Sequence, residues 1–596
     1  MKRIPLFVAC SLLVFGSLTM SACLVLSAQE TPKTSASGVD MIWGVKIPLR
    51  DGVHLNATVY QPHNQKEPLP LIFTFTPYTD YFVTDRAIYF ASKGYVSALV
   101  DVRGRGNSEG AFEPFVNEGK DGYDATEWFA KQSYCNGKVA MWGLSYMGFD
   151  QWTVAKEFPS HLVTIVPTAA AYPSVDFPFR YNFFYPYEMQ WLTATSGHTQ
   201  NMKIFENDSF WDEKSRELYK AHGALVDFDK LVGNPSPIFQ KWLQHPTPDA
   251  YYDAMVPSPD QYKKLKLPIL TITGHYDADQ PGAFTFYKRH MEYGSSEAKA
   301  NHYLIIGPWD HLGTLNPKLE MGGLKFAETS VIDLNKLHDE WYAWTLKAGP
   351  RPDFLKKRVA YYVMGAEVWK YADSLETITD GALTFYLSSD GAASDVFHSG
   401  TLLSEKGASP KPDSWVYDPL DNRSGEAEPE ENPSYLTSQT GIINMFGQGL
   451  IYHSDALPAA TEISGFPKVT VWLAMDVPDT DLEVTLYEIL SDGSSIQLSS
   501  ANMRARYRES LRQEKPVPPG KAEKYVFDNF TFFSRQVAKG SRLRLVVGSI
   551  NSPSSEKNYN SGGVVAKETG KDARTAHIQL SHDAEHPSVL ELPIVK

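Results

Sequence analysis

The segment GKVAMWGLSYMGFDQW, residues 137–152, contains the feature that decides the fold. A short apolar run, KVAMW, leads almost directly into Ser145, and the residues that follow the serine are compatible with a helix. In a nucleophile elbow, a buried strand turns sharply into a helix at the serine, and nearby glycines permit the turn that projects the hydroxyl from the edge of a sheet. Gly143 and Gly148 flank the serine. Ser145 is therefore the candidate nucleophile.

A second serine between glycines occurs in GNSEG, residues 106–110. Here the residues RGR separate Ser108 from the preceding apolar run, and Pro114 soon interrupts any helix. The context of an elbow is missing, so we predict that Ser108 is a loop residue.

Apolar runs alternate with helix-compatible segments on both sides of the elbow. Strands that are buried on both faces and alternate with helices indicate a parallel α/β sheet. The segment 44–62 alternates apolar and polar residues around an Asp-Gly pair, which is typical of a β-hairpin. The predicted strands lie in residues 69–77, 94–102, 138–143, 162–168, 267–274 and 302–308.

Two other regions differ from this pattern. Residues 171–264 are rich in aromatic residues and proline and have helical but no strand patterns, which predicts a helical cap inserted between core segments 40–170 and 265–349. From residue 350 to 596, short alternating strands are bounded by Gly, Pro, Asp and Ser, which predicts a β-sandwich or jelly roll. A chain of 596 residues is too long for one core, so about two to four domains are expected.

An elbow serine needs a histidine base and a carboxylate that orients the histidine. On this fold the acid and then the histidine follow the serine along the chain, in loops after later strands. The run at 267–274 ends in HYDAD, which offers Asp277 and Asp279, and the run at 302–308 leads to His311. We select Asp277 as the acid, because it is nearer the strand end, and His311 as the base.

Three other histidines of the α/β region are less suitable as the base. His275 lies near the same strand end but precedes Asp277, which breaks the expected order. His290 lies on a predicted helix, and His302 begins a strand, at the wrong edge of the sheet.

An oxyanion hole needs two donors directed at the developing negative charge. One is expected to be the backbone N–H of Tyr146, directly after the nucleophile, and the other to come from the loop after an earlier strand. In that loop, TPYTD, Tyr78 can donate its phenol; the alternative is a tyrosine that only packs in the core.

The amino-terminal 30 residues have the pattern of an export signal, with two basic residues, an apolar stretch and small residues before a polar start. We expect cleavage after Ala28 and a periplasmic or extracellular protein with no membrane span in the mature chain. An uncleaved anchor and a lipoprotein attached through Cys23 are the alternatives. After cleavage Cys135 is the one remaining cysteine, which excludes an intramolecular disulfide and a cysteine-built metal site. The net charge of −14 argues against nucleic acid as a partner.

Several segments together resemble the group of cocaine esterase, α-amino-acid ester hydrolase and glutaryl-cephalosporin acylase, within the X-prolyl dipeptidyl peptidase superfamily of serine hydrolases. The resemblance implies an α/β-hydrolase core with an inserted helical cap and a C-terminal jelly roll, and an enzyme that uses no metal or cofactor. It covers residue 42 to the end. The segments are IPLRDGVHLNATVYQP (47–62), TPYTD (76–80), DVRGRGNSEG (101–110), 121–148, HYDAD (275–279), GPWDH (307–311), VMGAEVWKYAD (363–373), 476–493, 503–510 and GSRLRLVVGSINSP (540–553).

Carried over residue by residue, the resemblance implies that Ser145 attacks an ester or amide carbonyl, with Asp277 and His311 as the other triad members and Tyr78 and Tyr146 as the oxyanion hole. The α-amino-acid ester hydrolases of the group bind the substrate ammonium with a carboxylate cluster. Only two acids are evident at the corresponding places, so the resemblance does not imply strict specificity for α-amino substrates. These two candidate substrate-binding residues are Asp279 and, in the cap segment 172–184, Asp176.

Two other functions remain open from the sequence. A dipeptidyl aminopeptidase of the X-prolyl type would need an anionic pocket for a free amine, for which Asp176, Asp279 and Glu188 are the candidates. An exported binding protein would use the β domain to hold carbohydrate, with an inert hydrolase core. The sequence does not decide whether the protein forms a homo-oligomer. It also does not decide whether the substrate is an ester, an amide or a short peptide.

Overall fold

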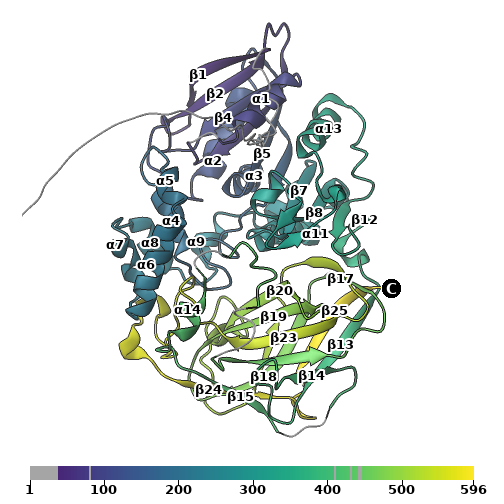
Figure 1. Ribbon diagram of the computed structural model, residues 1–596. Helices are drawn as coiled ribbons and strands as arrows, with labels where there is room; N and C mark the ends of the chain where they lie inside the picture. The colour runs from purple at the N-terminus through teal and green to yellow at the C-terminus, as the bar shows by residue number, and fades with distance from the viewer. Residues whose placement is uncertain (1–37, 80–81, 408–410, 430–431, 440–445) are drawn as a thin grey trace, which may run out of the picture. The chain divides into compact units, whose positions relative to one another are not determined.

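The computed structural model describes residues 38–79, 82–407, 411–429, 432–439 and 446–596 (Figure 1). The predicted export signal, residues 1–28 with Cys23, lies outside the described residues. Within them, no helix has both the length and the apolar character needed to cross a membrane.

A ten-stranded mixed sheet forms the core of the catalytic region. Its strand order is β1-β2-β4-β3-β5-β6-β7-β8-β11-β12, and neighbouring strands from β4 to β11 are parallel. The predicted hairpin is confirmed as the antiparallel pair β1 and β2, and the six predicted strands are confirmed as β3 to β8. The bounds are β1 Val39–Pro48, β2 His54–Pro62, β3 Leu69–Thr76, β4 Val96–Asp101, β5 Cys135–Leu144, β6 Leu162–Thr168, β7 Ile269–Tyr276, β8 His302–Asp310, β11 Val359–Val363 and β12 Val368–Ala372.

Helices cover both faces of this sheet because successive side chains of each buried strand point to opposite faces. One face packs Met141 of β5 with side chains of α2, α3 and α11, and the other packs Trp142 with side chains of α1 and α13. The helices are α1 Thr84–Ser92, α2 Glu118–Phe129, α3 Tyr146–Ala155, α11 Gln280–Tyr293, α12 Ser296–Ala300 and α13 Leu334–Lys347.

The cap, residues 171–264, connects β6 to β7 and is helical, as the sequence predicts. Its aromatic side chains pack together with residues of the core, and Trp191 and Trp242 lie in this cluster. The helices are α4 Tyr187–Ala194, α5 Met202–Phe205, α6 Asp208–Lys220, α7 Phe228–Leu231, α8 Pro237–Leu243, α9 Ala250–Asp253 and α10 Pro259–Lys264.

The C-terminal region is an all-β domain whose thirteen described strands share one hydrogen-bonded network. Its main apolar cluster is distinct from those on the two faces of the hydrolase sheet, although it includes Tyr362 of β11. The strands are β13 Gly381–Ser388, β14 Gly400–Leu403, β15 Asp413–Tyr417, β16 Gly449–Ser454, β17 Thr461–Gly465, β18 Lys468–Met475, β19 Asp481–Ile489, β20 Ser495–Arg504, β21 Glu523–Phe527, β22 Phe533–Val537, β23 Arg542–Ser549, β24 Ala576–Ser581 and β25 Val589–Val595.

Residue 350 stays the predicted start of the β domain, but two strands after it join the hydrolase sheet. Strand β11, which the sequence assigned to the β domain, pairs in parallel with β8 and extends the hydrolase sheet, and β12 pairs with β11. The sequence did not predict this pairing because a strand pattern is local and does not specify which sheet the strand joins. The first strand of the β domain is β13.

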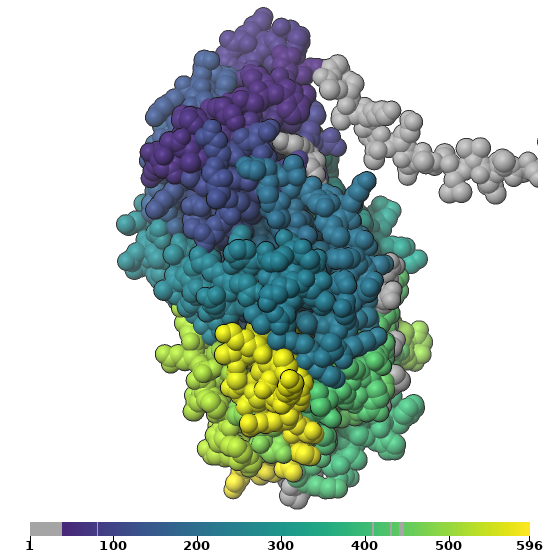
Figure 2. Space-filling view, turned by 90° about the vertical axis from the view of Figure 1, so that its left-hand side faces the viewer, coloured from purple at the N-terminus to yellow at the C-terminus, as the bar shows by residue number. Residues whose placement is uncertain are grey.

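The cap also contacts the β domain. Tyr219 of α6 donates its hydroxyl to Asn551 Oδ1 at 2.7 Å, and the N–H of Gly570 donates to the main-chain oxygen of His222 at 2.9 Å. Figure 2 shows this border, where the blue to teal cap lies against the yellow C-terminal segment.

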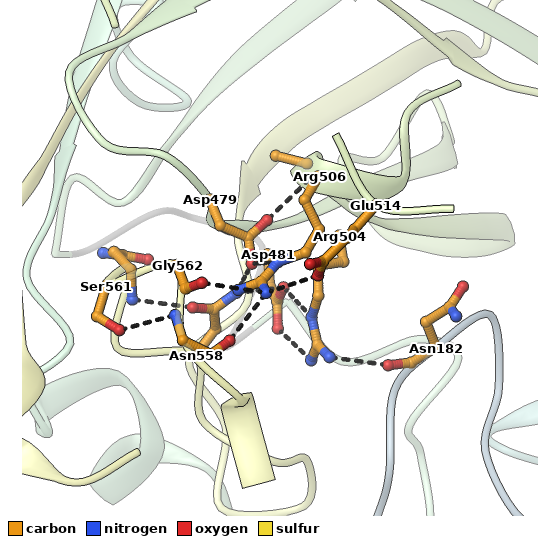
Figure 3. Close-up of polar contacts among 12 residues, drawn as sticks. Asn182, Asp479, Asp481, Arg504, Arg506, Glu514, Asn558, Ser561 and Gly562 are labelled. Carbon is orange, nitrogen blue, oxygen red and sulfur yellow. Dashed lines mark hydrogen bonds and ion pairs between the residues drawn. The ribbon is translucent and has the colours of Figure 1, made fainter. Parts of the chain in front are cut away.

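A buried charged network reinforces this contact (Figure 3). Arg504 is 4% exposed, binds Asp481 through two hydrogen bonds of 2.9 and 3.0 Å, and donates to Glu556 at 2.7 Å. It also donates to the main-chain oxygen of Asn182 in the cap, at 2.9 Å. Glu556 in turn accepts the N–H of Phe184 at 3.1 Å. The β domain therefore fixes the main chain of the cap segment next to the catalytic region.

Candidate active site

Ser145 lies between β5 and α3 in a strained turn. Its φ of 60° and ψ of −125° are unfavourable for a residue with a side chain, as expected of a nucleophile elbow. The flanking glycines are required because neighbouring atoms lie too close to leave room for a side chain at either position. A Cβ on Gly143 would lie 2.5 Å from Met147 Cβ, and one on Gly148 would lie 2.7 Å from the oxygen of Thr168. The surrounding chain therefore holds the turn that projects the serine.

Ser108 is a buried loop residue, which confirms the prediction. Its hydroxyl donates to the main-chain oxygen of Asp101 at 2.7 Å and accepts the N–H of Asn56 at 2.8 Å. Although GNSEG has the strict Gly-x-Ser-x-Gly spacing, both hydrogen bonds of Ser108 join its hydroxyl to main-chain groups.

Asp277 and His311 meet at the carboxyl edge of the sheet, after β7 and β8. His311 Nδ1 lies 2.8 Å from Asp277 Oδ1. The Asp277 side chain is fully buried and also accepts the hydroxyl of Thr273 at 2.8 Å and the N–H of Asp279 at 3.0 Å. This carboxylate is therefore held in one orientation and fixes a proton on Nδ1 of His311, while Nε2 lies on the side of Asp279.

Asp279 lies between the serine and the histidine. Its Oδ2 accepts the hydroxyl of Ser145 at 3.4 Å and lies 3.9 Å from His311 Nε2. Burial raises the pKa of Asp279 to about 6, although the nearby His311 opposes this shift. Burial alone would lower the pKa of His311, but the charge of Asp279 and the hydrogen bond and charge of Asp277 outweigh it and raise the pKa to about 9. Without substrate, the imidazole is thus held in its protonated form between two carboxylates.

Tyr78 and Tyr146 both lie beside Ser145. The Tyr78 hydroxyl accepts the indole N–H of Trp191 at 3.1 Å. Burial raises the pKa of this phenol, and the nearby Ser145 side chain opposes the shift. Tyr146 is the first residue of α3, one of the positions whose N–H has no acceptor within a helix. Its phenol donates to Glu118 Oε1 at 2.5 Å and is buried. The structure thus brings one phenol and one unpaired N–H to the nucleophile.

The three histidines rejected as the base are buried and have other partners. His275 Nε2 lies 2.8 Å from the main-chain oxygen of Tyr362 in β11. His290 and His302 contact each other, with 2.9 Å between their Nδ1 atoms. None of the three contacts Ser145.

Comparisons with known proteins relate this chain to a family of hydrolases. The family model for X-Pro dipeptidyl-peptidase (S15 family) matches residues 51–313, and the model for the X-Pro dipeptidyl-peptidase C-terminal non-catalytic domain matches residues 354–591. The cocaine esterase of Rhodococcus sp. (strain MB1 Bresler) is 26% identical over 577 residues, which cover 93% of this chain and 98% of that protein. The chain therefore carries the catalytic and C-terminal regions of an S15 serine hydrolase and is similar to the cocaine esterase and α-amino acid ester hydrolase group.

Solved structures share the fold of this S15 hydrolase. An aminopeptidase from the marine sediment archaeon Thaumarchaeota archaeon superimposes with a TM-score of 0.80 at 21% identity, covering 98% of this chain and 100% of that one. An α-amino acid ester hydrolase superimposes with a TM-score of 0.79 at 20% identity, covering 96% and 100%.

The two other acids named from the sequence have main-chain partners in this hydrolase. Asp176 accepts the N–H of Tyr172 at 2.7 Å and that of Gly282, the third residue of α11, at 2.5 Å. Burial and the charge of Asp279 raise the pKa of Asp176 well above its usual range. Glu188 accepts the N–H of Tyr185 at 2.7 Å in the first turn of α4. Asp176 therefore lies near Asp279, whereas Glu188 binds the main chain just before α4.

Sequence reasoning did not single out Trp191 or Glu118, which contact the two tyrosines beside the serine. Trp191 is one of many aromatic residues in the cap, and Glu118 begins an ordinary amphipathic helix. No local motif distinguishes them, because both contacts join segments that are distant in the chain.

Proposed function

We propose that this hydrolase cleaves ester or amide bonds through an acyl-enzyme on Ser145. Ser145 Oγ attacks the carbonyl carbon while His311 Nε2 takes its proton, and Asp277 orients and stabilises the imidazolium. The leaving alcohol or amine departs with the proton from His311. Water, deprotonated by His311, then attacks the acyl-enzyme and releases the acid and free Ser145. The observation that carries this proposal is the 2.8 Å Asp277–His311 contact at the sheet edge where the strained serine lies.

The negative oxygen of each tetrahedral intermediate would be bound by the Tyr78 phenol and the Tyr146 N–H. Donors that are already oriented stabilise the charge as it develops without further reorganisation. The effect of the Ser145 side chain on the pKa of the Tyr78 phenol supports this role, since it requires the phenol to lie near the attacking atom.

Asp279, with Asp176 beside it, would form an anionic subsite. In the absence of substrate Asp279 holds both the serine hydroxyl and the charge of His311. A substrate ammonium paired with Asp279 would weaken its hold on the protonated imidazole and release the base for the reaction. The aromatic side chains of the cap favour an apolar or aromatic group next to the reacting carbonyl.

Ester hydrolysis is the first candidate, because the full-length relative is a cocaine esterase. Release of N-terminal dipeptides is the second, since the family model is named for that activity and the carboxyl pair Asp176 and Asp279 can take a free amine. Rates on p-nitrophenyl esters, amino-acid esters and dipeptide p-nitroanilides would separate the two. Export stays a prediction, which the N-terminal mass of the mature protein tests.

Replacement of Ser145 tests the assignment directly. Ser145→Ala should abolish turnover and labelling by a fluorophosphonate while the melting temperature stays unchanged. Ser108→Ala is the comparison, because it removes a hydroxyl from the other serine between glycines and should leave labelling intact. Loss of labelling only in the Ser108 variant would overturn the assignment. Wild-type protein that takes no label would instead indicate a non-catalytic binding protein.

A further inference from the structure

Trp191 of α4 contacts both residues of the proposed oxyanion hole. Its indole N–H donates to the Tyr78 hydroxyl at 3.1 Å. Its ring stacks on the ring of Tyr146, with centroids 5.5 Å apart and an interplanar angle of 22°. Trp191 is 4% exposed, so water does not compete for these contacts.

The indole contact determines which way the Tyr78 hydroxyl can donate. An indole N–H is a donor only, whereas a phenol has one proton and also accepts. Because the Tyr78 oxygen accepts from Trp191, its own proton must be directed to another partner, and the Ser145 side chain lies near the same hydroxyl. Accepting one hydrogen bond also strengthens the bond that the same hydroxyl donates.

The cap fixes the main chain around Tyr78 as well. Buried Arg105 donates from Nε to the oxygen of Pro77 at 2.8 Å and from Nη1 to the oxygen of Thr195, directly after α4, at 2.6 Å. The N–H of Thr79 donates to Gln200 Oε1 at 3.1 Å, and the N–H of Gln200 donates to Thr79 Oγ1 at 2.8 Å. Three consecutive residues of the loop after β3 are thus held, directly or through Arg105, by the cap segment 191–200.

We propose that Trp191 is a positioning residue for catalysis, through which the cap completes the oxyanion hole of the core. The indole N–H directs the Tyr78 proton to the reacting oxygen, and the indole face holds the residue whose N–H is the second donor. This inference rests on the proposed roles of Ser145 and Tyr78.

A double-mutant cycle between Trp191 and Tyr78 tests this role. Tyr78→Phe alone should lower kcat by about 10²–10³, the loss found when one oxyanion donor is removed. Trp191→Phe keeps an aromatic ring but removes the N–H, and we expect it to lower kcat about tenfold with KM changed less than twofold. In the Tyr78→Phe background, Trp191→Phe should cause no further loss of kcat, because the hydroxyl that it orients is absent.

Trp242→Phe is the matched control. Trp242 is fully buried in the same aromatic cluster, with its ring centroid 6.5 Å from that of Trp191, and its side chain interacts with Tyr251. The Trp242→Phe variant should leave kcat unchanged. The melting temperatures of all variants show whether each one folds.

Three results would overturn the inference: equal losses of kcat in the two tryptophan variants, full additivity of Trp191→Phe with Tyr78→Phe, or a change in KM alone. The second would mean that Trp191 acts independently of Tyr78, and the third would indicate a substrate contact. Unchanged kcat in Tyr78→Phe would instead reject the oxyanion role of Tyr78 itself, which distinguishes the two failures.

Discussion

Removal of the Asp279 charge should change the pH at which His311 becomes a base. Asp279 Oδ2 lies 3.9 Å from His311 Nε2, and its charge is the strongest of the interactions that raise the pKa of His311 to about 9. Asp279→Asn keeps the size of the side chain and a group that can accept from Ser145, but removes the charge. The imidazole of the variant should therefore lose its proton at lower pH than in the wild type.

The size of the change follows from the separation of the charges. Two unit charges about 4 Å apart near a protein surface interact by about 4 kcal/mol, which corresponds to about three pH units. The His311 side chain is 28% exposed, so solvent screens part of this energy, and about two pH units is the expected displacement. At pH 7 the variant then has a much larger fraction of neutral His311 and should hydrolyse a neutral ester about tenfold faster than the wild type.

The measurement is the pH dependence of kcat/KM for a neutral p-nitrophenyl ester, which reports the base of the free enzyme. The acidic limb should move from near pH 9 in the wild type to near pH 7 in the variant. Asp253→Asn removes a carboxylate that pairs with Arg512 at the surface, and should leave the limb unchanged. An acidic limb that does not move in Asp279→Asn would refute the electrostatic account. A matched amino-acid ester should lose its advantage over the neutral ester in the same variant.

Two further predictions concern the acid and the buried histidines. Asp277→Asn should lower kcat by about 10⁴ with little effect on KM, because the amide no longer fixes the Nδ1–H tautomer of His311, and a loss below tenfold would exclude Asp277 as the orienting acid. Burial lowers the pKa of His290 to about 4, whereas an unfolded histidine titrates near 6.5, so the unfolded chain binds more protons below pH 6.5. The stability that depends on neutral His290 is therefore complete above pH 6.5 and is lost as the pH falls toward 4, by up to about 3 kcal/mol. Denaturation midpoints at pH 7 and pH 4.5 should show this decline, and His290→Gln should reduce it; an equal decline in the variant would assign it to other groups.

The sequence by itself determined the order of elements and the three residues of the proposed triad. Strand and helix patterns repeat over a few residues, so β5, the turn at Ser145 and α3 could be predicted from one short segment. Because carboxyl ends of parallel strands lie at one edge of a sheet, the same patterns also predicted that Asp277 and His311 would lie close to the serine.

The tertiary structure decided which groups act on those residues. It added β11 to the hydrolase sheet, brought Asp279 between Ser145 and His311, and joined Trp191 to Tyr78 across 113 positions of the chain. A residue type and its neighbours in sequence specify local conformation and burial, but not which distant side chain lies within hydrogen-bonding distance. The packing of the cap and the β domain on the core sets that distance. The same packing therefore decides the charge of His311 and the direction of the Tyr78 hydroxyl.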